Sequence, residues 1–162
     1  MGIEQARNHL QRFGRDLDIL ESPVSSATVE LAALALGVEP ARIAKSLTFM
    51  ATDGTALMVV TAGDVRVDNA KFKAQFGVKA SMLSPEQVVL LVGHAVGGVC
   101  PFGVLPTTSV YLDVSLRRFK TVFPACGSHN SSIELTCEEL ERTSEPRGWV
   151  DVGKLATAVA HG

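Results

Sequence analysis

Four short segments of this 162-residue chain contain residue types that could bind or activate a ligand. Lys45 opens a β-like run, and its ammonium could stabilise negative charge that develops on an oxygen atom. In residues 96–103 adjacent glycines are followed by a proline, so the main chain could approach a ligand closely. Residues 25–28 place hydroxyls before a helix, and residues 127–132 are small and polar.

Each segment also has an ordinary structural explanation. A lysine at a strand end is usually a solvated edge charge. Hydroxyls that precede a helix are usually caps, and small polar residues between two strands suit a hairpin turn. The glycine loop differs because Val99, Cys100 and Phe102 lie among its glycines. A loop this apolar indicates the wall of a pocket.

The sequence lacks the common enzyme motifs GxxxxGK[ST], GxGxxG, HExxH and GxSxG. Its four histidines are scattered without helical ligand spacing, and its three cysteines form no CxxC pair. We therefore expect neither a metal site nor a cofactor. Three cysteines cannot all pair within one chain, which favours free thiols and a reducing, cytoplasmic location.

Composition excludes several classes of protein. Hydrophobic residues make up 46% and charged residues 20% of the chain, which predicts a folded core. No apolar run approaches the ~18 residues of a membrane span, and we expect no secretory signal. The formal net charge of −2 argues against binding long duplex DNA through its phosphates. The absence of repeats and linkers predicts a single domain over residues 1–162.

The elements that must position these residues are predicted from periodicity, caps and turns. Two β-like runs around Asp53-Gly54 predict a hairpin, and the capping boxes at 84–87 and 136–139 each predict the start of a helix. We expect further helices over residues 3–13, 29–36 and 70–76, and from 153 to the end. Further strands are expected over residues 17–20, 78–83, 109–114, 120–126, 131–135 and 149–152. The predicted class is α/β (α+β mixed) with a curled mixed sheet.

The order of these segments resembles the YbaK/ProX family of aminoacyl-tRNA deacylases, which is related to the editing domain of prolyl-tRNA synthetase. The resemblance spans about residues 17–140. It depends on the helix at 26–37, Ala44-Lys45-Ser46-Leu47, the Gly97-x-x-x-Pro101 loop, and Gly127-Ser128-His129-Asn130 leading into Ile133-Glu134-Leu135. It implies a barrel-like mixed sheet flanked by helices. It also implies hydrolysis of the ester that joins a wrong amino acid to tRNA, most often tRNA(Pro).

The resemblance further implies which residues form the site. Lys45 and Gly97 would be catalytic. The substrate would contact Thr28, Ser46, Gly98, Val99, Pro101, Gly127, Ser128, His129 and Asn130. The acyl group removed would be alanine, serine, cysteine or 2-aminobutyrate. The expected partners are the acceptor end of a mischarged tRNA and prolyl-tRNA synthetase, with no membrane and no sequence-specific DNA, and the enzyme would be free-standing.

Two alternatives remain open from the sequence. One is a Cys–His hydrolase that uses Cys100 with His94 or His129, although a buried, unreactive thiol is the preferred interpretation of Cys100. The other is a tRNA- or synthetase-binding module that has the fold without the chemistry. Contact with tRNA would use a local basic patch, either Arg66, Lys71, Lys73 and Lys79 or Arg117, Arg118 and Lys120.

Overall fold

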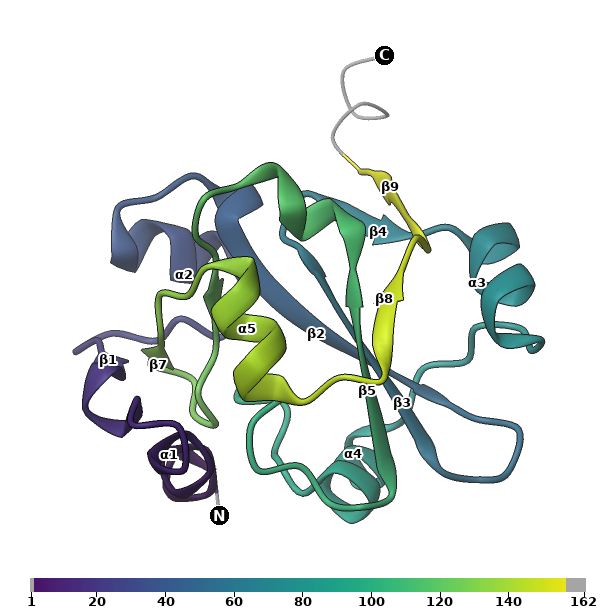
Figure 1. The fold of residues 1–162 in the computed structure, drawn as a ribbon, viewed down its shortest axis with the longest axis horizontal. Coiled ribbons are helices and arrows are strands. Elements are labelled where there is room, and N and C mark those ends of the chain that lie inside the picture. Colours follow the sequence, from purple (N-terminus) through teal and green to yellow (C-terminus); the bar gives the residue numbers. More distant parts are fainter. Residues whose placement is uncertain (1, 157–162) are drawn as a thin grey trace.

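The computed structural model describes residues 2–156 and has a mixed five-stranded sheet at its centre (Figure 1). The strand order is β6-β2-β3-β5-β8, with β2 antiparallel to β3 and the other pairs parallel. These strands are β2 (Ile43–Met50), β3 (Ala56–Ala62), β5 (Thr108–Asp113), β6 (Phe123–Pro124) and β8 (Gly148–Val150). Two small ribbons pair β1 (Leu20–Glu21) with β7 (Ser131–Ser132), and β4 (Val65–Val67) with β9 (Gly153–Leu155).

The hairpin expected around Asp53-Gly54 joins β2 to β3. Asp53 Oδ1 accepts a hydrogen bond from Thr55 N at 3.0 Å, and Gly54 has a φ of +84°, which a glycine adopts without strain. All seven residues of β3 are buried because strands flank it on both edges and side chains cover both faces. The hairpin therefore anchors the sheet and fixes the register of β2.

Helices surround the sheet, and their ends follow the caps in the sequence. They are α1 (Ile3–Gln11), α2 (Val29–Leu36), α3 (Asn69–Phe76), α4 (Pro85–Val92) and α5 (Cys137–Ser144). The capping boxes that begin at Ser84 and Thr136 both form, which confirms the predicted starts of α4 and α5. No helix within residues 2–156 is long and apolar enough to cross a membrane.

The core lies on both faces of the sheet. On one face, Met58 and Leu112 pack with Leu10, Val88 and Leu140, which belong to α1, α4 and α5. On the other face, Phe49 and Val59 pack against Phe72 of α3. Helix α2 lies at the β6 end of the sheet, where Ala32 and Ala33 contact Ile43 and Phe123. This arrangement places α2 beside the first half of β2.

Several predicted strands were too long. Residues 78–83 form only a single bridge, between Met82 and Phe49, and residues 120–126 and 131–135 shrink to the two-residue strands β6 and β7. The strand predicted over residues 17–20 was also wrong, because a 3₁₀ turn (Asp16–Asp18) precedes the short β1. These segments lie at sheet edges, where pairing is interrupted, and isolated bridges join Val122 to Leu135 and Ala125 to Ser132 beside the two-residue strands.

One further expectation, a helix from residue 153, is corrected, and another, a barrel-like sheet, is not confirmed. Residues 153–155 form strand β9, which pairs with β4 and is not the start of a helix; the rest of that predicted helix, from 157 onward, lies outside the described residues. Within residues 2–156 the five-stranded sheet has β6 and β8 as its edge strands, so closure into a barrel is not confirmed. The fold is thus mixed α/β, as predicted.

Candidate functional site

A cavity of about 390 Å³ lies where α2, β2 and the loop after α4 meet. Its walls come from five parts of the chain: the segment that enters α2, the first half of β2, the turn into α4, the glycine loop and the β6–β7 region. Five residues of the site predicted from sequence line it: Thr28, Lys45, Ser46, Gly97 and Val99. The cavity thus joins segments as far apart in sequence as Ser26 and Ser132.

Main-chain groups of Ser46 face the cavity because β2 lacks a neighbouring strand there. On the edge of β2 away from β3, the ladder with β6 ends at the Ala44–Pro124 pair. The next hydrogen bond on that edge runs from Leu83 N to Thr48 O at 3.2 Å. Successive residues of a strand direct their N–H and C=O groups to alternate edges, so Ser46 shares the outward direction of Thr48. Ser46 therefore presents one donor and one acceptor to a ligand.

Lys45 is the sole charged side chain among the described residues that line the cavity. It is half-buried, and within residues 2–156 its ammonium has neither a hydrogen bond nor an ion pair. Burial lowers the pKa of Lys45 below that of an ordinary lysine, while the charges of Asp64 and Glu30 act in the opposite direction. Asp64 itself is held by Arg118, with an N–O distance of 2.6 Å. The ammonium of Lys45 is therefore available to a ligand.

The glycine loop is held against residues 127–128 by close main-chain packing. A side chain at Gly98 would place its Cβ 2.6 Å from the carbonyl carbon of Gly127 and 2.8 Å from Ser128 N. Gly97, which lines the cavity, has a φ of +97°, a conformation that favours glycine. The two glycines therefore serve different purposes: one allows close packing, and the other allows the turn.

Residues 127–130 lie outside the lining of the cavity and form hydrogen bonds with the segment that precedes α2. The carbonyl of His129 accepts a hydrogen bond from Ser26 Oγ at 2.9 Å, and Asn130 Nδ2 donates to Ser22 O at 2.9 Å. These bonds fix the segment that leads into α2. Six predicted site residues are therefore outside the lining of the cavity: Gly98, Pro101, Gly127, Ser128, His129 and Asn130. Pro101 is buried and faces a separate groove beside His9.

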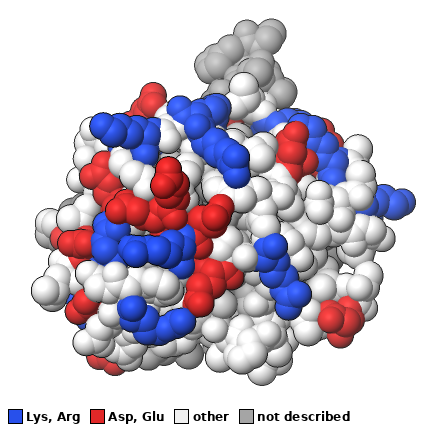
Figure 2. All heavy atoms as spheres, viewed as in Figure 1, with Lys and Arg blue, Asp and Glu red and all other residues white. Residues whose placement is uncertain are grey.

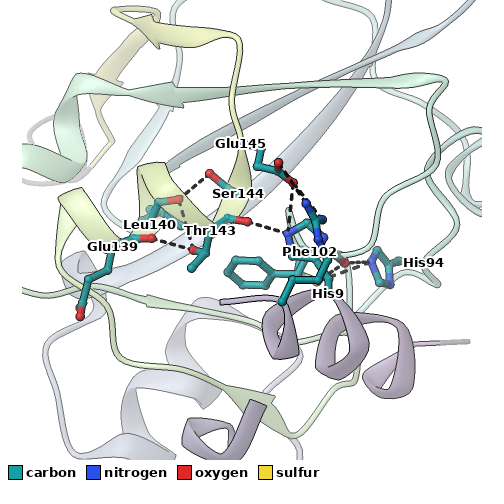
Figure 3. Close-up of polar contacts among 10 residues, drawn as sticks. His9, His94, Phe102, Glu139, Leu140, Thr143, Ser144 and Glu145 are labelled. Atoms are coloured by element: carbon teal, nitrogen blue, oxygen red, sulfur yellow. Dashed lines mark hydrogen bonds and ion pairs between the residues drawn. The ribbon is translucent and has the colours of Figure 1, made fainter. Parts of the chain in front are cut away.

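Cys100 and His94 do approach each other, as the Cys–His alternative requires. Cys100 Sγ lies 3.6 Å from His94 Nε2, and both contact the carbonyl of Phe102, which lies next to His94 in Figure 3. Neither residue has any exposed surface. Burial raises the pKa of the Cys100 thiol to about 12 and lowers the pKa of His94. The pair is therefore neutral at pH 7 and closed to substrate, which argues against a thiolate nucleophile.

Sequence reasoning missed several residues that shape the cavity. Thr48 and Ser132 contribute hydroxyls, and Ala32, Ile43 and Phe123 contribute apolar surface. The alternation of Ser46 and Thr48 on one face of β2 was a usable signal, because polar side chains pointing toward a core need a reason. The contributions of Ser132 and Phe123 depend on tertiary packing and carry no local signal.

Comparison with known proteins identifies the family. Residues 24–143 match the aminoacyl-tRNA editing domain, which is most of the chain. The chain belongs to the aminoacyl-tRNA editing domain family. The matched region contains every residue named above for the cavity, so the cavity lies within the editing domain.

Two relatives and one solved structure are similar to most of this chain. The protein YwhH of Bacillus subtilis (strain 168) is 51% identical over 95% of this chain and 98% of its own length. A candidate Cys-tRNA(Pro)/Cys-tRNA(Cys) deacylase, EbsC of Enterococcus faecalis, is 26% identical over 70% of each chain. The crystal structure of a candidate trans-editing enzyme for prolyl-tRNA synthetase superposes with a TM-score of 0.84, at 29% identity over 94% of this chain and 96% of that one.

Proposed function

We propose that this protein is a free-standing trans-editing deacylase that hydrolyses the ester between a small, wrongly attached amino acid and tRNA(Pro). The observation that carries the proposal is that Lys45, whose ammonium has no hydrogen bond or ion pair within residues 2–156, lines one cavity with Ser46 and Gly97. Membership of the aminoacyl-tRNA editing domain family supports the same class of substrate.

The proposed chemistry needs no serine or cysteine nucleophile, because an aminoacyl ester is already reactive toward water. Water adds to the carbonyl carbon, the carbonyl oxygen gains negative charge, and the bond to the ribose oxygen then breaks. The ribose oxygen leaves with a proton, and the free amino acid carries the oxygen from water. The protein has to hold the ester in place and stabilise the oxyanion.

Two kinds of donor in the cavity suit that oxyanion. The half-buried ammonium of Lys45 supplies a fixed positive charge in a region of reduced dielectric. The outward N–H of Ser46 supplies a dipole that needs no reorganisation during the reaction. The carbonyl of Ser46 and the main chain at Gly97 are acceptors for the substrate amine or a ribose hydroxyl.

The size of the cavity limits the substrate to the acceptor end of tRNA. A volume of about 390 Å³ accommodates an aminoacyl group with its ribose, while the rest of the tRNA must lie outside. Apolar walls at Ala32, Ile43 and Phe123 sort acyl groups mainly by excluding larger ones, since one methylene changes binding by only ~1–3 kcal/mol. We therefore infer that alanine, serine, cysteine and 2-aminobutyrate enter, and that proline is rejected.

Contacts with the body of the tRNA are proposed to be weak and sensitive to salt. Lys and Arg are interspersed with Asp and Glu on the face shown in Figure 2. In the two basic patches predicted from sequence, Arg118 pairs with Asp64 and Lys71 pairs with Asp151 at 3.2 Å. Paired cations release fewer counterions on binding phosphate. Recognition of tRNA(Pro) would then depend on prolyl-tRNA synthetase, the partner that we propose.

The test is a panel of tRNA(Pro) molecules charged with alanine, serine, cysteine, 2-aminobutyrate or proline. We expect the purified protein to hydrolyse at least one of the four small esters well above the rate in buffer and to leave Pro-tRNA(Pro) intact. Lys45→Ala should lose this activity while remaining folded. Hydrolysis of none of the four, or equal hydrolysis of the prolyl ester, would overturn the proposal.

A further inference from the structure

Six hydroxyl side chains line the cavity, and three of them have structural partners. Ser26 Oγ donates to the carbonyl of His129 at 2.9 Å, and Thr28 Oγ1 accepts from Leu31 N at 3.1 Å as the cap of α2. Ser131 Oγ accepts from the Ser128 hydroxyl at 2.7 Å. These three hydroxyls hold the walls of the cavity together, so their polar groups are already satisfied.

The other three hydroxyls, on Ser46, Thr48 and Ser132, have no hydrogen bond to any residue between 2 and 156. Thr48 is 5% exposed and Ser132 is 8% exposed, yet within residues 2–156 neither hydroxyl oxygen is a fully buried atom without a partner, so both reach solvent at the cavity. A ligand that displaces this solvent must replace its hydrogen bonds. Thr48 and Ser132 therefore offer polar groups to a ligand.

The fold brings these groups to the lining of one cavity. Ser46 and Thr48 are two residues apart on β2 and so point to the same face of the sheet. Ser132 belongs to β7 and forms a bridge with Ala125, just beyond the point where β6 leaves β2. The lining contains no carboxylate among the described residues, so hydroxyls and main-chain groups provide its acceptors.

We propose that Thr48 and Ser132 select an acyl group whose short side chain bears a hydroxyl, that of serine, over the apolar side chain of equal size in 2-aminobutyrate. This inference rests on the proposed deacylase function and narrows its substrate. A seryl hydroxyl both donates and accepts, so it satisfies the two protein hydroxyls together. The terminal methyl of 2-aminobutyrate leaves them unpaired, which disfavours that ester by about tenfold for each lost hydrogen bond.

The experiment compares kcat/KM for seryl and 2-aminobutyryl esters on the same tRNA(Pro). Wild type should favour the seryl ester by at least about tenfold. Thr48→Val and Ser132→Ala should each reduce this preference by about tenfold, by slowing the seryl ester alone. Ser131→Ala is the matched control, because that hydroxyl bonds Ser128 and its loss should change both esters by the same factor. Thermal unfolding verifies that each variant is folded.

The outcomes distinguish failure of this inference from failure of the proposed deacylase function. Equal kcat/KM for the two esters in wild type would overturn the inference and leave the deacylase function standing. Equal slowing of both esters by Thr48→Val and Ser132→Ala would also overturn it, because the hydroxyls would then hold a group that the two esters share. If no ester is hydrolysed, the proposed function fails. Binding of the seryl and 2-aminobutyryl amides of 3′-amino-3′-deoxyadenosine then decides the inference: tighter seryl binding that Thr48→Val abolishes supports it, and equal binding overturns it.

Discussion

Replacing Lys45 with methionine should abolish catalysis without weakening the fold. Methionine fills nearly the same space as the lysine stem but removes the ammonium. Loss of one preorganised group that stabilises an oxyanion costs about 10²–10³ in kcat, equivalent to about 3–4 kcal/mol. We therefore expect deacylation by Lys45→Met to fall at least about a hundredfold, with a smaller change in KM.

The stability of the Lys45→Met protein, unlike its catalysis, should not decrease. The ammonium of Lys45 has no partner within residues 2–156, and Asp64, the carboxylate whose charge acts on it most, retains both hydrogen bonds to Arg118, at 2.6 and 3.0 Å. Removing Lys45 thus leaves no buried charge unpaired and relieves the desolvation of the ammonium. The melting temperature should be unchanged or slightly higher.

The assay is single-turnover deacylation of the preferred ester, paired with thermal unfolding of the same samples. Lys154→Met is the matched control, since Lys154 is exposed on β9, lies in neither basic patch and has only a 3.9 Å ion pair with Asp68. It should change neither the deacylation rate nor the melting temperature. A folded Lys45→Met protein with kcat within about threefold of wild type would refute the electrostatic role. A drop of several degrees in its melting temperature would refute the reasoning on stability.

Three further predictions follow from the same region. Gly98→Ala should destabilise the protein by about 1–3 kcal/mol and slow deacylation, because its Cβ would lie 2.6 Å from the Gly127 carbonyl. Thermal unfolding measures this loss. The control Gly148→Ala should show none, because a Cβ at Gly148 would have no neighbour within 4 Å. Cys100, with a pKa of about 12 and no exposed surface, should resist iodoacetamide in the native protein at pH 8, and an adduct there by mass spectrometry would revive the thiol alternative. Because burial lowers the pKa of Lys45 and only the protonated form stabilises an oxyanion, kcat/KM should fall as pH rises through that lowered pKa, below 10.5. As pH rises from the lowered pKa of folded Lys45 toward 10.5, the free energy of unfolding should increase, because the folded state loses the penalised charge while the unfolded state still carries it. Lys45→Met should show neither the fall in kcat/KM nor the rise in stability.

Local rules determined the helices and the hairpin. The capping boxes at Ser84 and Thr136, the threonine cap at Thr28 and the Asp53-Gly54 turn each satisfy main-chain groups within a few residues, so their signals are complete in the sequence. The same locality explains why Lys45 and Gly97 stood out, since a lysine opening an apolar strand and a glycine-rich apolar loop are visible without a fold.

Tertiary structure decided which polar groups face the cavity. The short strands β6 and β7 form only where distant residues supply their partners, and β6 leaves β2 after Ala44. That early departure exposes the main chain of Ser46. It also brings Ser132 to the cavity and leaves residues 127–130 outside its lining. Pairing at a sheet edge depends on which segments the whole fold brings together, so sequence alone determined the parts of the site and the fold determined its lining.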